Sequence, residues 1–80
     1  MDPKFTSALD GIISVMTTAN IGIPLIFGAA SSLIGIWHAA HPDDPVLTAG
    51  ELATRIEAQC QANAAYGAAE IARLRALIGG

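Results

Sequence analysis

The middle of the chain holds four side chains of the types that bind metal ions, His38, His41, Asp43 and Asp44. Histidines three residues apart lie on one face of a helix, and imidazole and carboxylate groups are common zinc ligands. Pro42 interrupts that geometry, however, and no further ligand is fixed on a rigid element. We therefore expect a polar loop here and predict neither a metal site nor a bound cofactor.

The nucleophilic side chains do not form a catalytic pattern. Cys60 is the only cysteine, and a single cysteine on an apolar helix face is most often a small buried hydrophobic residue. Ser31 and Ser32 lie in an apolar segment without a neighbouring base, and no glycine-rich phosphate loop follows a strand. We expect a protein that is not an enzyme.

Composition narrows the class of protein. Of 80 residues, 52% are hydrophobic and 14% are charged, and the net charge is −3. The hydrophobic share is high and the charged share is well below the typical quarter, a combination that excludes a disordered chain. The four cationic residues are scattered, whereas nucleic-acid binding needs clustered positive charge, so we expect no nucleic-acid partner. A chain of this size is marginally stable alone and usually depends on a partner or a membrane.

A long uncharged segment dominates the N-terminal half. No Asp, Glu, Lys or Arg occurs from Gly11 to Pro42. An apolar run of about 18 or more residues without charges is a transmembrane candidate. A continuous helix over Ile12–Trp37 would be about 39 Å long, more than the roughly 30 Å of the hydrocarbon core. The segment must therefore tilt, bend or leave the membrane.

The residues Asn20 to Pro24 provide a place for a bend. Pro24 removes a backbone donor, and Asn20 and Gly22 tolerate the left-handed conformation that ends helices. Two interpretations stay open, a single kinked membrane helix over about 3–40 with its bend at 20–24, or two helices on either side of that bend.

The C-terminal part begins with a clear helix signal. After a Pro/Asp loop at 41–47, Thr48 and Glu51 have the spacing of a capping box. Alanine is abundant from there on, and no proline follows, so we predict one long amphipathic helix over 49–78. The expected fold class is all-α, with an N-terminal apolar segment (1–40), a linker (41–47) and an alanine-rich helix (48–80).

Two helix faces have the composition of helix–helix interfaces. Small side chains allow helices to pack closely in lipid. In the membrane segment they are Thr18, Gly22, Gly28, Ser32 and Gly35. On the C-terminal helix the face consists of Leu52, Ile56, Cys60, Asn63, Gly67, Ile71 and Leu74. Its small middle, from Cys60 to Gly67, is the expected point of closest approach to a partner helix.

The order of these elements, with the stretch Val46-Leu47-Thr48-Ala49-Gly50-Glu51-Leu52 opening an alanine-rich helix, resembles small one-span membrane proteins of tailed bacteriophages, often called holin-like. The resemblance implies a phage-encoded membrane or virion protein that assembles into oligomers. It carries no functional residue beyond the start of the helix.

We therefore expect a small, self-associating helical membrane protein with a holin-like, pore-forming role. Its partners would be the lipid bilayer and further copies of the chain or a larger helical assembly. If the chain is phage-encoded, its location would be the bacterial inner membrane. The alternatives are a structural virion protein of a tail or ejection assembly, and a regulatory membrane peptide of a larger complex.

Overall fold

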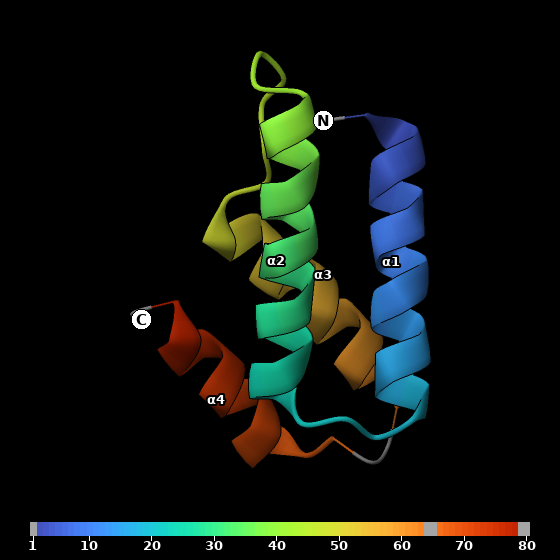
Figure 1. The fold of residues 1–80 in the computed structure, drawn as a ribbon. Helices are drawn as coiled ribbons and strands as arrows, with labels where there is room; N and C mark the ends of the chain where they lie inside the picture. The colour runs from blue at the N-terminus through green and yellow to red at the C-terminus, as the bar shows by residue number, and fades with distance from the viewer. Residues whose placement is uncertain (1, 64–65, 79–80) are drawn as a thin grey trace.

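Four α-helices make up the part of the chain that the computed structural model describes, residues 2–63 and 66–78. They are α1 (Pro3–Thr18), α2 (Ile23–Ala40), α3 (Ala49–Gln61) and α4 (Ala68–Leu77). No strand occurs within these ranges, so the predicted all-α class is confirmed. Figure 1 shows α1 and α2 side by side and antiparallel, with α3 behind α2 and α4 on the side of α2 away from α1.

The apolar N-terminal segment is divided into two helices at the expected bend. Asn20 adopts the left-handed conformation with φ 58°, which asparagine accepts more readily than most residues. The Asn20 and Ile21 amides donate to the carbonyls of Thr17 and Met16, the pattern of a Schellman motif. The segment over 3–40 is therefore a helical hairpin and not a single kinked helix.

The C-terminal part begins as predicted but is not one helix. The Thr48 hydroxyl accepts from the Glu51 amide at 3.1 Å, and the Glu51 carboxylate accepts from the Thr48 amide at 3.0 Å. The prediction of one helix over 49–78 is wrong, because α3 ends at Gln61 and α4 begins at Ala68. A straight helix of that length would extend about 45 Å, beyond the 37 Å long axis of the molecule. The break lets α4 fold back onto the same core.

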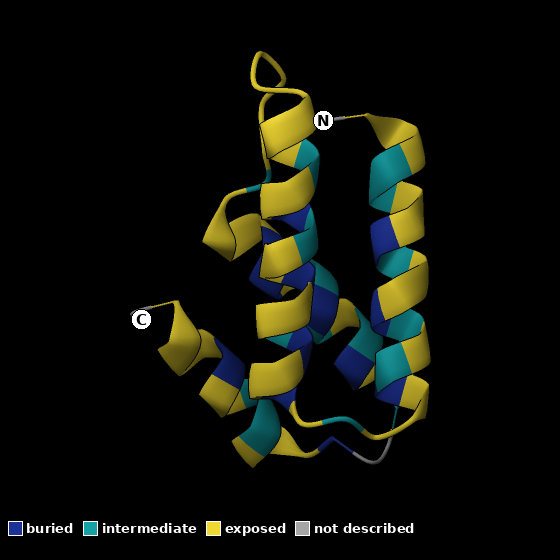
Figure 2. Ribbon diagram, in the orientation of Figure 1, coloured by how far each residue is buried: buried dark blue, intermediate teal, exposed yellow. Residues whose placement is uncertain are grey.

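One apolar cluster joins all four helices. α2 and α3 each pack against the other three helices, and buried faces point inward from each element (Figure 2). The cluster consists of Leu9, Ile13, Ile23, Ile26, Ala30, Ile34, Leu52, Ala53, Ile56, Cys60, Tyr66 and Leu74. The radius of gyration is 12.3 Å, close to the roughly 11.6 Å expected of an 80-residue domain. The C-terminal helices are thus folded back on the hairpin instead of extending from it.

Candidate functional site

α2 is the described helix that is long and apolar enough to cross a membrane. It has 18 residues, a mean hydropathy of 1.5 and no Asp, Glu, Lys or Arg. Signal sequences and core helices of soluble proteins also have such composition. A core helix would be mostly buried, however, whereas only 22% of α2 is buried in the bundle. Length and composition therefore make α2 the candidate membrane-active element.

The two faces of α2 have different surroundings. The inner face, Ile23, Ile26, Ala30 and Ile34, lies in the core. The outer face is exposed along the helix (Figure 2), and the side chains of Leu25 and Ile36 are each 70% exposed. Aliphatic side chains so open to water leave α2 with an apolar surface that the chain itself does not cover.

The small residues predicted as an interface lie on the surface. Gly28, Ser32 and Gly35 are exposed on α2, and a Cβ built at either glycine meets no atom within 4 Å. Thr18 and Gly22, at the end of α1 and the start of α2, are exposed too. All five are thus exposed in the single chain, although Thr18 also lines a cleft that α1 forms with α3. Their role in contacts between chains stays a prediction.

The C-terminal residues of the predicted interface divide into two groups. Leu52, Ile56, Cys60 and Leu74 are buried and Ile71 is half-buried, and all of them pack into the core of their own chain. Gly67 is instead the exposed N-cap of α4, and a Cβ built there meets no atom within 4 Å. Within its own chain Gly67 is therefore not at a close helix contact, and its role in contacts between chains stays a prediction. The small residues from Cys60 to Gly67, which were interpreted as the centre of an interface, mark the boundary between α3 and α4.

Among the described residues, three polar contacts join the C-terminal half to the hairpin, one from Arg55 on α3 and two from Asn63 and Tyr66, which lie between α3 and α4. Arg55 Nη1 donates to Asp10 Oδ2 at 2.7 Å. Asn63 Nδ2 donates to the Thr17 carbonyl at 2.7 Å, and the Tyr66 hydroxyl donates to the Ile21 carbonyl at 2.6 Å. Sequence analysis missed these contacts. A signal was present for the first of them, because Asp10 is the only charged residue between positions 5 and 42 and is therefore the one candidate for an ion pair in that segment.

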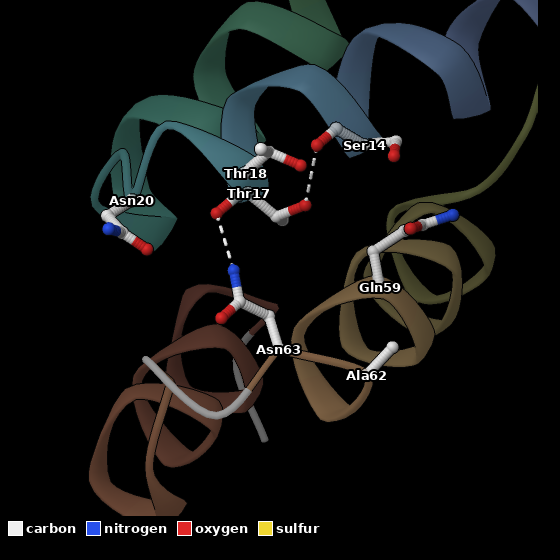
Figure 3. A pocket seen from close by; sticks show the side chains of 7 residues that line it. All are labelled: Ser14, Thr17, Thr18, Asn20, Gln59, Ala62 and Asn63. Carbon is white, nitrogen blue, oxygen red and sulfur yellow. Dashed lines mark hydrogen bonds between the residues drawn. The ribbon is translucent and has the colours of Figure 1, made fainter.

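A polar cleft of about 540 Å³ lies where the ends of α1 and α3 meet (Figure 3). It is lined by Ser14, Thr17, Thr18, Asn20, Gln59, Ala62 and Asn63. Part of this polarity is already used, since the Thr17 hydroxyl donates to the Ser14 carbonyl at 2.9 Å. The lining offers neutral hydrogen-bonding groups and no titratable side chain, so it cannot supply a general acid or base.

His41 and Cys60, which suggested metal or thiol chemistry, are held by contacts within the chain. Nδ1 of His41 lies 3.1 Å from the Trp37 carbonyl, and the two rings stack with centroids 4.3 Å apart. Across the described ranges, no three His, Cys, Asp or Glu side chains come close enough to hold a metal ion. Burial raises the pKa of the Cys60 thiol, which keeps it protonated and unreactive.

Comparison with protein families, characterised proteins and solved structures finds no match.

Proposed function

We propose that this chain is a small, self-associating helical membrane protein whose α2 enters the lipid bilayer. The observation that carries the proposal is the state of α2, an uncharged 18-residue helix that is only 22% buried in its own bundle. At 1.5 Å per residue such a helix is about 27 Å long, close to the roughly 30 Å of the hydrocarbon core.

The predicted driving force for insertion is modest. α2 contains seven Ile, Leu or Phe residues, which together favour insertion by about 2–4 kcal/mol. Pro24, the two serines and His38 oppose it. A helix with so small a margin gains from packing against another helix in lipid, which supports self-association as part of the proposal.

Insertion is tested by a charge on the outer face of α2. Ser32 lies near the middle of α2 and is exposed, so Ser32→Asp leaves the core of the bundle intact. At the bilayer centre an aspartate costs about 2.5–3.5 kcal/mol. We expect the wild-type chain to float with vesicles and resist carbonate extraction, and Ser32→Asp to remain in the aqueous fraction. Ala58→Asp adds the same charge on the exposed side of α3 and should behave as wild type. Equal flotation of all three chains would contradict insertion of α2.

Self-association is tested at the two outer glycines. Because Gly28 and Gly35 are exposed and a Cβ built at either meets no atom within 4 Å, we expect leucine at both positions to leave the single bundle undisturbed. If helices of different copies pack through this face, the double variant should reduce cross-linked oligomers in detergent while vesicle binding is kept. Gly11→Leu, at an exposed position of α1, is the matched control. Dye release from vesicles then tests whether the assembled helices form a pore.

A second candidate is a structural component of a multi-chain helical assembly such as a virion. It is favoured by the core that the four helices of one chain share. In that case the outer face of α2 packs against other protein chains. Recovery of large soluble assemblies without detergent would support this candidate over the first.

A further inference from the structure

The three polar contacts between the halves are arranged unevenly. Their hairpin ends are Asp10, Thr17 and Ile21, which lie on α1 and on the turn after it. Between described residues, no hydrogen bond or ion pair runs from α3 or α4 to α2, although both helices pack against α2. Among the described residues, α3 is therefore bonded to α1 through Arg55, and Asn63 and Tyr66, which lie between α3 and α4, are bonded to the end of α1 and the turn after it. The described residues of α3 and α4 pack on α2 without such a bond.

This cover is incompatible with α2 in a bilayer. A helix that packs along a membrane-spanning helix shares its depth in the hydrocarbon core. α3 carries Glu51, Arg55 and Glu57, and α4 carries Glu70, Arg73 and Arg75. Charged side chains at such depth are costly, so α2 cannot cross a membrane while α3 and α4 remain packed on it.

We infer that α3 and α4 form a releasable cover over the inner face of α2, and that the partner competing for this face is a lipid bilayer. In the closed bundle, Leu52, Ile56 and Leu74 share one core with the inner residues of α2. When the two halves separate, the same inner face meets lipid. The contacts of Asp10, Thr17 and Ile21 with the C-terminal half set how often the cover opens. This inference rests on the proposed function, since it assumes that α2 enters a bilayer.

Charge indicates which bilayer serves as the probe. The net charge is −3 and the cations are dispersed, so an anionic surface repels the chain as a whole. We therefore expect insertion into zwitterionic phosphatidylcholine vesicles, and less insertion when anionic lipid is added.

The fluorescence of Trp37 reports the insertion of α2 into the bilayer. Trp37 is the only tryptophan, it lies near the end of α2, and in the bundle its ring centroid is 5.1 Å from that of Phe5. Quenching of its fluorescence by brominated phosphatidylcholine occurs only when α2 is in contact with lipid chains. The rate of quenching after mixing with vesicles therefore measures insertion of α2.

Two kinds of variant test the cover. One removes polar bonds between the two halves, which we call the loosened variant, and the other cross-links the halves, which we call the locked chain. The double variant Asp10→Asn, Tyr66→Phe removes one ion pair and one hydrogen bond between the halves. Because the ion pair is half-exposed, we expect quenching about three- to ten-fold faster than wild type. Glu57→Gln with Arg75→Gln breaks an ion pair of 2.6 Å between α3 and α4 and should leave the rate unchanged.

The locked chain carries Asp10→Cys and Arg55→Cys joined by a short bis-maleimide. It also carries Cys60→Ala, because opening of the bundle would expose the Cys60 thiol, which is buried in the closed state, to the reagent. We expect quenching to fall to the level seen without vesicles and to recover in the same chain left unlinked. Circular dichroism establishes that each variant keeps its helices. If the loosened variant unfolds, the comparison of quenching between the locked and unlinked chains is sufficient to test the cover.

The outcomes separate the two proposals. A locked chain that inserts as fast as the unlinked chain overturns the cover and leaves the membrane function intact. If wild type, loosened and unlinked chains all escape quenching, the proposed function fails, and the cover fails with it.

Discussion

The hairpin of α1 and α2 and the C-terminal pair of α3 and α4 are built in different ways. Asp10 is the only charged residue between positions 5 and 42, whereas α3 and α4 together carry six charged side chains. The hairpin contributes large aliphatic residues to the core, and the C-terminal pair contributes a short stripe on otherwise polar helices.

This difference indicates which half depends on the other. Isolated helices shorter than about 12–15 residues are marginal in water, and α3 and α4 have 13 and 10 residues. Their stability therefore comes from packing on the hairpin. The hairpin nevertheless keeps an apolar outer face in the folded chain, where Leu25 and Ile36 are exposed.

The largest expected effect comes from truncating the inner face of α2. Ile26 is fully buried and belongs to the shared core. Ile26→Ala should reduce the free energy of unfolding by about 2–5 kcal/mol, through lost burial and the cavity that remains. If the C-terminal pair depends on the hairpin, all four helices should unfold together in urea, as followed by circular dichroism.

The neighbouring residue Leu25 is the matched control for this prediction. Its side chain is 70% exposed, so Leu25→Ala should change the free energy of unfolding by less than about 0.5 kcal/mol. Equal losses at both positions would mean that the two faces of α2 do not differ as the structure has them.

The comparison also shows what sequence could predict. The all-α class and the capping box at Thr48 follow from local patterns, and both are present. The position of the bend was also foreseen, because Asn20 and Pro24 each restrict the backbone locally. Whether that bend separates two helices was left open, since the answer depends on packing of α1 against α2.

The break between α3 and α4 was missed for a physical reason. Alanine favours helix wherever it occurs, so an alanine-rich stretch gives little warning of an interruption. Asn63 and Gly67 are residues that end and begin helices, but at a spacing of four they also fitted one helix face. Long-range contacts decide between these interpretations, above all the bond from Asn63 to the Thr17 carbonyl.

A smaller loss of stability is expected at the start of α3, where the Thr48 capping box stabilises the first turn of the helix. Thr48→Ala removes the hydroxyl that accepts from the Glu51 amide and should cost about 0.5–2 kcal/mol of stability. Urea unfolding followed by circular dichroism measures this cost. Thr54→Ala, in the middle of α3, removes a hydroxyl that bonds only to the preceding turn and should cost less. A larger loss at Thr54 would show that the cap does not matter to the folded chain.

The smallest effect is a dependence on pH that arises from the same cap. Hydrogen bonds from the Thr48 backbone and side chain lower the pKa of Glu51 below its ordinary value. Because the folded pKa is lower than the unfolded one, the stabilisation is complete above the usual glutamate pKa of about 4.3 and is lost as the pH falls through the folded value. Glu51→Gln keeps an oxygen that accepts from the Thr48 amide but does not titrate. The difference in melting temperature between wild type and Glu51→Gln should therefore be constant near pH 7 and shrink as the pH falls below about 4.3. Asp43→Asn removes one carboxylate from the exposed loop and serves as the control. A difference that is the same at pH 3 and pH 7 would show that the ionised Glu51 carboxylate does not stabilise α3.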